Sequence, residues 1–440
     1  MSSFSRALRH GPFFQALGGM EEGDVDWPVT SAGLVVLRLV DAWLDEGPHV
    51  AAADAWGVRT VREAIAEAGA QPALRAILSS IVDAITEPRG GAEAAAGADV
   101  ARRETPRQDI PRRPGIALIA PRLMAYGRAL DFEGKWPLAG DVYSTIVEYA
   151  DPQEDSDVAI DANMRLGYCL RMLGDLDAAA SAYSLAGRIA AECGDLVKVL
   201  RAQIADAKIA LARGNLPRAE QLLERTTVRA RESRLDEVQG FALLDRSAVA
   251  YTRGDFERAA GFAYQALNVL TSPIERDRAL ADLATSFVKL GVRSAARDAL
   301  LILAATAQEQ FSRWAAMINL LDLEVLEGSE PRFEQYRRDL ADVALPPILR
   351  AEYFLHAGGG YARFGQRELA RSSYARAIEV ATAHAYHQVA FRAEQALREL
   401  EAGGRAVERR APAAPAVPLS ADVRAIADAV SEMRQLAGVS

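Results

Sequence analysis

A glycine recurs along most of this chain at a nearly constant spacing. The seven positions are Gly134, Gly174, Gly214, Gly254, Gly291, Gly328 and Gly365, separated by 40, 40, 40, 37, 37 and 37 residues. A fixed period between about 20 and 50 residues is typical of repeat proteins, in which each unit packs only against its neighbours. A chain of 440 residues is also too long for one compact core. The spacing therefore predicts an elongated array of repeated units.

Other positions repeat in register with these glycines. Five residues after the glycine, six units have alanine and the sixth unit has Phe333. Seven residues before it the chain has Gly127, Gly167, Ala207, Ser247, Ala284, Leu321 and Gly358. Nine residues after it, three units have an aromatic residue, namely Tyr143, Tyr183 and Tyr374. Small side chains at this spacing let two helices cross closely, and a glycine between them can adopt positive φ and end the first helix.

This pattern resembles the tetratricopeptide repeat (TPR) family, whose unit is a pair of antiparallel helices. The resemblance implies an all-α fold, a right-handed superhelical α-solenoid of seven TPR-like repeats plus a capping helix over residues 115–402. The period exceeds the family's usual value of about 34 residues, so we expect lengthened helices. The sixth unit has Leu321 and Phe333 where small residues are expected, and we expect it to be splayed or rotated.

The resemblance also assigns a binding groove to the first helix of each unit. Carrying the family's groove positions over gives, for the first five units, Met124, Arg128, Met164, Tyr168, Arg171, Arg201, Ile204, Lys208, Phe241, Tyr251, Arg278 and Lys289. In the last two units the same positions include Ile318, Asp322, Glu352, Leu355 and Arg363. Arginines beside adaptable apolar side chains suit an extended peptide with an acidic group or a free carboxylate. The alternative is that the arginines pair with nearby acids such as Asp131, Asp161 and Asp206.

The first 87 residues predict a small helical bundle that could cap the array. We expect residues 1–28 to be irregular, with helices over 31–46 (capped by Ser31), 58–68 and from Pro72 onwards. Residues 52–61 resemble a helix-turn-helix, but two residues are missing between its Gly57-Val58 and Thr60-Val61 pairs. The net charge of −9 also disfavours nucleic acid as a partner.

Two linkers and a final helix complete the chain. Residues 88–114, rich in arginine and proline, predict a disordered linker, and residues 403–419 predict a second linker rich in proline and alanine. Residues 420–440 predict an amphipathic helix capped by Ser420. A helix of this length is marginal alone in water, so we expect it to dock on its own solenoid, on a second copy or on a partner. Docked in the groove, this helix would be an autoinhibitory plug. Docked between two copies, it would be a ligand that joins a dimer.

Chemistry-bearing motifs are weak throughout. His384 and His387 offer half a metal site, and Gly358-Gly359-Gly360 lacks the strand and lysine of a phosphate loop, so close helix packing explains it better. No uninterrupted run is apolar enough for a membrane span, and two cysteines make no disulfide framework. We expect no enzyme activity, no cofactor and no metal.

These features together predict a cytoplasmic scaffold that binds a protein or peptide segment. Abundant alanine and arginine suggest a bacterial source. The alternative is a transcriptional or signalling regulator whose N-terminal helical domain contacts DNA or an effector.

Overall fold

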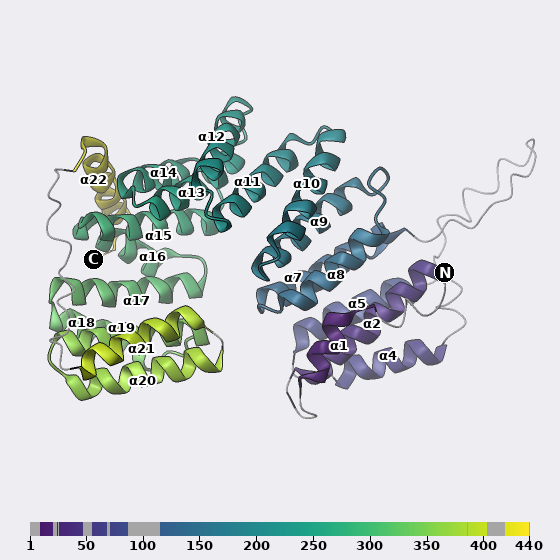
Figure 1. Cartoon of the computed structure of the whole chain (residues 1–440), viewed down its shortest axis with the longest axis horizontal. Coiled ribbons are helices and arrows are strands. Elements are labelled where there is room, and N and C mark those ends of the chain that lie inside the picture. The colour runs from purple at the N-terminus through teal and green to yellow at the C-terminus, as the bar shows by residue number, and fades with distance from the viewer. Residues whose placement is uncertain are drawn as a thin grey trace, which may run out of the picture. The chain divides into compact units, whose positions relative to one another are not determined.

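The computed structural model describes residues 9–20, 24, 26–46, 55–67, 71–86, 115–384, 386–402 and 419–439. Every regular element in these ranges is a helix (Figure 1). The chain divides into two compact units, Met1–Arg213 and Gly214–Ser440. The boundary falls at the turn glycine of the third repeat. The two predicted linkers, apart from Leu419, lie outside the described residues.

The first unit begins with a bundle of four helices: α1 (Gly11–Gly18), α2 (Trp27–Glu46), α4 (Ala55–Glu67) and α5 (Pro72–Thr86). Helix α2 packs against the other three, and the bundle also contacts the first repeat. One apolar core runs from Phe13 through Leu37 and Leu78 into Tyr143 of that repeat. The bundle thus has the contacts expected of a cap on the array.

Two local predictions for this bundle are wrong, and the helix-turn-helix resemblance, already disfavoured by its two missing residues, does not hold. Helix α1 lies in the segment expected to be irregular, because Pro12 stands in its first turn, where proline is tolerated. Helix α2 begins at Trp27 rather than after Ser31, since Pro28 likewise suits a first turn. Helix α4 runs unbroken through Gly57, so the turn of a helix-turn-helix does not form there.

Among the helices described, only α2 has the length and apolar composition to cross a membrane, over Trp27–Asp45. Of this stretch, 61% is buried inside the protein, including Val36, Leu37 and Val40. Such burial is typical of a core helix.

The repeats follow as consecutive helices. In the first unit they are the short 3-10 turn η2 (Ile116–Leu118), α7 (Ala120–Phe132), α8 (Trp136–Tyr149), α9 (Ser156–Met172), α10 (Leu176–Glu192) and α11 (Leu196–Ala212). In the second unit they are α12 (Leu216–Glu232), α13 (Asp236–Arg253), α14 (Phe256–Val269), α15 (Pro273–Leu290), α16 (Arg293–Thr306), α17 (Gln310–Glu327), α18 (Glu330–Ala341), α19 (Pro347–Arg363), α20 (Arg367–Ala383) and α21 (His387–Glu401). Within each unit every helix packs on the next one, as a helical-repeat fold requires. The first helices of the repeats are the odd-numbered ones from α7 to α19, and the second helices are the even-numbered ones from α8 to α20.

The recurring glycines end the first helices as expected. All seven have positive φ, between 74° and 85°. The side chains of Asp175, Asn215 and Asp255 then cap the following helices by accepting a hydrogen bond from the backbone N–H three residues later. Local backbone chemistry therefore sets the pairing of helices.

Helix length explains the two periods from Gly174 onwards, whereas the first 40-residue spacing holds the 14-residue α8 and a longer loop before α9. Helices α10, α11 and α12 each have 17 residues, and so fill the 40-residue spacing. Where the spacing falls to 37, the second helices α14 and α16 have only 14 residues. The expectation of lengthened helices is confirmed.

The sixth repeat departs from the others. Its second helix, α18, has only 12 residues, and its first helix, α17, packs directly against α19 of the next repeat. Phe333 is fully buried between the rings of Tyr361 and Phe364, with centroids 5.6 Å and 5.4 Å away. Phe333, a large side chain where the other repeats have alanine, thus changes the packing of this repeat.

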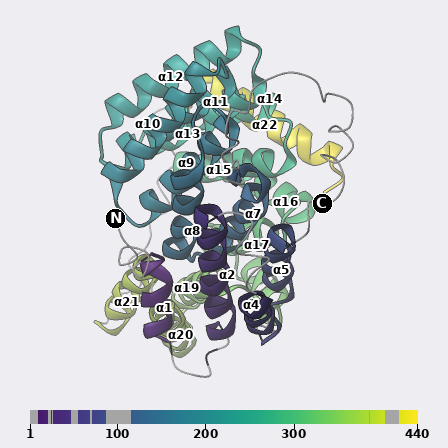
Figure 2. The same ribbon diagram turned by 90° about the vertical axis from the view of Figure 1, so that its right-hand side faces the viewer.

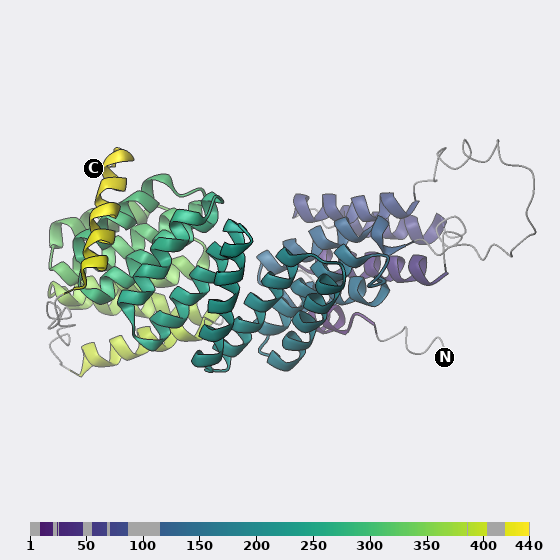
Figure 3. The same cartoon turned by 90° about the horizontal axis from the view of Figure 1, so that it is seen from above.

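The final helix, α22 (Ala421–Leu436), is capped by Ser420 and packs against α14 and α16, both second helices (Figures 2 and 3). Val423, Ile426 and Val430 are buried in this contact. Arg434 lies 2.7 Å from the carboxylate of Asp298. The hypothesis that α22 plugs a groove of first helices is therefore wrong, because it docks on the opposite members of the helix pairs.

Candidate functional site

The groove positions assigned in the first unit differ widely in exposure. Arg128 and Arg201 are exposed, and Met164, Tyr168, Arg171 and Lys208 are half-buried. Met124 and Ile204 are only 7% and 5% exposed and offer almost no surface to a ligand. Hydrophobic side chains on a first helix face the partner helix as readily as a groove, so sequence offsets alone did not separate the two environments.

Arg171 stacks on an aromatic neighbour in this unit. Its guanidinium lies 5.4 Å from the centre of the Tyr168 ring, a cation–π distance. Two of the acids expected to neutralise the arginines pair with other residues: Asp131 with Arg165 at 3.6 Å, and Asp161 with Lys198 at 3.3 Å.

In the second unit Phe241 and Tyr251 are half-buried, while Arg278 and Lys289 are exposed. Arg278 lies 3.7 Å from Asp245 and 3.8 Å from Glu275. Nearby, burial raises the pKa of Asp282 to about 6, although Arg278 lowers it and Asp245 raises it further. This cluster is therefore largely neutralised from within.

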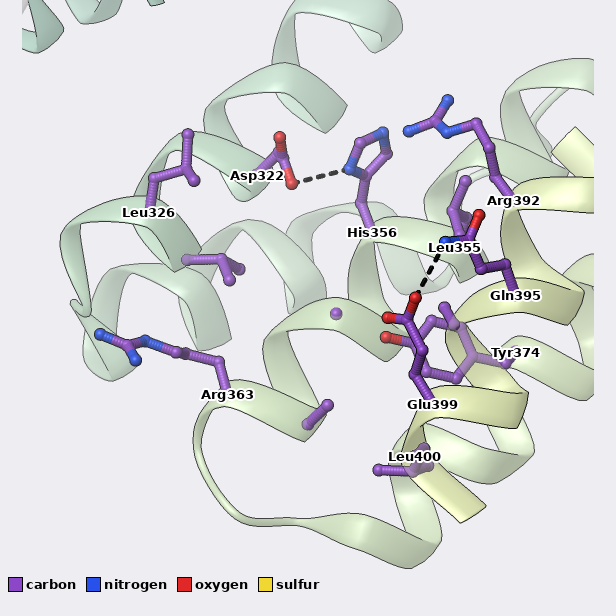
Figure 4. A pocket seen from close by; sticks show the side chains of 14 residues that line it. Asp322, Leu326, Leu355, His356, Arg363, Tyr374, Arg392, Gln395, Glu399 and Leu400 are labelled. Atoms are coloured by element: carbon purple, nitrogen blue, oxygen red, sulfur yellow. Dashed lines mark hydrogen bonds and ion pairs between the residues drawn. The ribbon is translucent and has the colours of Figure 1, made fainter. Parts of the chain in front are cut away.

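A pocket of about 300 Å³ lies on the first helices of the last two repeats and on the capping helix (Figure 4). Helices α17, α19 and α21 supply most of its lining, and Tyr374 of α20 adds one ring. The apolar lining consists of Val325, Leu326, Leu355, Ala362, Ala396 and Leu400. The polar side chains lining the same pocket are Asp322, His356, Arg363, Arg392, Gln395 and Glu399.

Both acidic groups that line the pocket are already engaged. Asp322 Oδ1 lies 2.8 Å from Nδ1 of His356, whose side chain is only 11% exposed. Glu399 accepts a 2.9 Å hydrogen bond from the side-chain amide of Gln395. In contrast, neither Arg363 nor Arg392 has a hydrogen-bond or ion-pair partner among the residues described. Figure 4 shows Arg392 beside the His356 ring and Arg363 at the opposite end of the pocket.

Three consecutive glycines of α19 have different surroundings. A Cβ on Gly358 would lie 2.6 Å from the ring of Tyr374, and one on Gly360 would lie 2.0 Å from Phe333. Close helix packing therefore explains these two, as expected. A Cβ on Gly359 would meet only the Tyr374 hydroxyl at 3.9 Å, an ordinary contact. A glycine inside a helix lowers the stability of the folded chain by roughly 0.5–1 kcal/mol relative to alanine. Close packing does not explain why a glycine stands at position 359.

The sequence found part of this pocket. Asp322, Leu355 and Arg363 stand at groove positions, and all three line it. It missed His356, because the groove offsets omit this position, and Arg392, because the capping helix lies outside the repeat pattern. Gly359 stands at a groove position, six residues before Gly365 as Arg128 is before Gly134, but a glycine has no side chain to be picked out there. The run of three glycines was the available signal.

The remaining chemical groups do not form a second site. His384 is the C-cap of α20 and His387 begins α21, so they do not share a helix face. Cys169 is buried, which raises the pKa of its thiol to about 12, and Cys193 is exposed. No group of three His, Cys, Asp or Glu side chains in the described ranges could hold a metal ion.

No protein family model and no curated protein matches this chain. Among solved structures, it is similar to a Rap protein complexed with competence and sporulation factor, with 13% identity and a TM-score of 0.44 over 87% of this chain and 99% of that one. It is also similar to BtubC (BKLC) from P. vanneervenii, with 18% identity and a TM-score of 0.34 over 53% of this chain and 84% of that one. At this level of similarity, neither protein's ligand nor its assembly carries over.

Proposed function

We propose that this chain is a non-enzymatic interaction scaffold of the TPR type, which binds a peptide or protein segment against the first helices of its repeats. We place it in the cytoplasm of a bacterium, in keeping with two free cysteines and an arginine-rich, alanine-rich composition. The single observation that carries the proposal is the pocket on α17, α19 and α21. An apolar lining with a few charged groups at its edge is typical of sites that bind peptide side chains.

The position of α22 supports this assignment. The chain covers the second helices α14 and α16 with its own C-terminal helix. No residue of α22 lines the pocket. The pocket is therefore accessible while α22 is docked.

Selection of binding peptides from a random library displayed on phage, with the full chain immobilised, tests the proposal. We expect one or a few related sequences to be enriched. Arg171→Glu and Arg201→Glu test the first unit, and Arg392→Glu tests the second. Arg229→Glu, on an exposed arginine of the second helix α12, is the matched control and should select the same sequences as the unmodified chain. Failure to enrich any sequence, or identical selections from all four variants, would refute the proposal.

A further inference from the structure

We infer that the pocket around Gly359 receives one aliphatic side chain together with an adjoining carboxylate. A peptide presents this combination at a C-terminal aliphatic residue, or where an acidic residue precedes an aliphatic one. The inference rests on the proposed function and specifies which chemical groups the second unit recognises.

Gly359 is the first observation. Its two neighbours are glycines because Tyr374 and Phe333 occupy the space of a side chain, but nothing of the protein occupies that space at Gly359. The space in front of it is the pocket itself. Leucine here would favour the helix and fill part of the pocket. The absent side chain therefore leaves room for a side chain of the ligand.

The lining decides which side chain fits. Val325 and Leu326 of α17, Leu355 of α19 and Leu400 of α21 give the pocket an aliphatic wall. A volume of about 300 Å³ holds one large aliphatic side chain with its adjoining backbone. Binding of such a side chain against this wall is favourable, because apolar surface of both the ligand and the pocket is removed from water.

The charged side chains of the pocket indicate which group of the ligand lies next to its aliphatic side chain. Asp322 already contacts His356, and Glu399 already accepts a hydrogen bond from Gln395. Arg363 and Arg392, without partners in the described part of the chain, are each available to bind an anion at their own end of the pocket. A guanidinium pairs with a carboxylate through two parallel hydrogen bonds, and a carboxylate is the anion that an unmodified peptide offers. Its two possible sources, a chain end and an acidic side chain, have the same chemistry.

Three fluorescein-labelled peptides of equal length, measured by anisotropy with the full chain, test the inference. The first ends in leucine with a free carboxylate, the second ends in the amide of leucine, and the third has glutamate before an amidated leucine. We expect the second peptide to bind at least tenfold more weakly than the better of the other two. Whichever of the first and third binds better identifies the source of the carboxylate. Equal binding of all three, or no binding of any, would overturn the inference.

Two variants locate the site. Gly359→Leu fills the pocket and Arg392→Glu reverses the charge, and each should weaken the better peptide at least tenfold. Gly359→Leu should leave the melting temperature unchanged or raise it, which separates a blocked pocket from an unfolded chain, and Arg229→Glu should bind as the unmodified chain does. Unchanged affinity in both pocket variants would refute the inference. If library selection still enriches peptides in those variants, the proposed function stands and only the assignment to this pocket fails.

Discussion

The ring of Tyr183 occupies the space that a side chain on Gly167 would need. A Cβ on Gly167 would lie 2.6 Å from Cε1 of that ring, closer than real contacts allow. The same relationship joins Gly127 to Tyr143 at 2.5 Å and Gly358 to Tyr374 at 2.6 Å. The four repeats without this tyrosine have no glycine at the matching position. The two positions, sixteen residues apart in each repeat, therefore share one volume between the paired helices.

This shared volume predicts a compensated pair of substitutions. Gly167→Ala should destabilise the chain by about 1–3 kcal/mol, because the tyrosine ring must move out of a packed interface. Combining it with Tyr183→Leu recreates the Ala207 and Leu223 combination of the third repeat. The alanine should then cost little relative to Tyr183→Leu alone. Thermal unfolding of the four proteins measures this coupling, and purely additive effects would contradict it.

The glycines of α19 predict opposite effects at adjacent positions. Gly359→Ala should stabilise the chain by roughly 0.5–1 kcal/mol, because the new methyl group meets only the Tyr374 hydroxyl at 3.9 Å. Gly360→Ala should destabilise it, because its Cβ would lie 2.0 Å from buried Phe333. Melting temperatures that shift in the same direction would disagree with the structure. The helix propensity of the two substitutions is the same, so each serves as the control for the other.

His10 predicts a loss of stability at alkaline pH. This residue is only 4% exposed, with Nδ1 2.7 Å from Asp141 and Nε2 3.1 Å from Asp41. Burial lowers the pKa of His10, but hydrogen bonds to Asp141 and Asp41 outweigh it and raise the pKa from 6.5 to about 9. Because the folded pKa is above the unfolded one, the stabilisation is complete below about pH 6.5 and is lost as pH rises through 9.

The measurement for His10 is the melting temperature between pH 6 and pH 10, compared with His10→Gln. The difference should be largest near pH 6, corresponding to at most about 3 kcal/mol from the difference in pKa, and should shrink as pH approaches 10. A constant difference across this range would show that His10 does not fold in its charged form.

The contact of α22 predicts a detachable helix. Val430 is fully buried against α14 and α16, so Val430→Glu should place a charge in that contact and release α22. Amide hydrogen exchange within α22 should then become much faster. Val423→Ala, a smaller loss at the same contact, should have an intermediate effect. Peptide binding at the Gly359 pocket should not change in either variant, and altered binding would contradict the separation of the two surfaces.

The sequence predicted the repeat fold well for identifiable reasons. The φ of a turn glycine such as Gly254, and a cap such as Asp255, depend on a few neighbouring residues. The capping helix expected at the end of the array is present as α21, His387–Glu401. Errors arose where the same residue type serves two purposes. Pro12 begins a helix where it could have broken one, and Met124 is buried where it could have lined a groove.

The sequence alone thus determined the period, the helix pairs and the close crossings, because these follow from backbone conformation and side-chain volume within one repeat. Tertiary structure decided which surface α22 covers, where His10 meets two carboxylates, and that Gly359 opens into a pocket. Each of these depends on residues far apart in the chain, such as His10 and Asp141, which are 131 positions apart. No local pattern encodes such distances, since they are set by how whole helices stack.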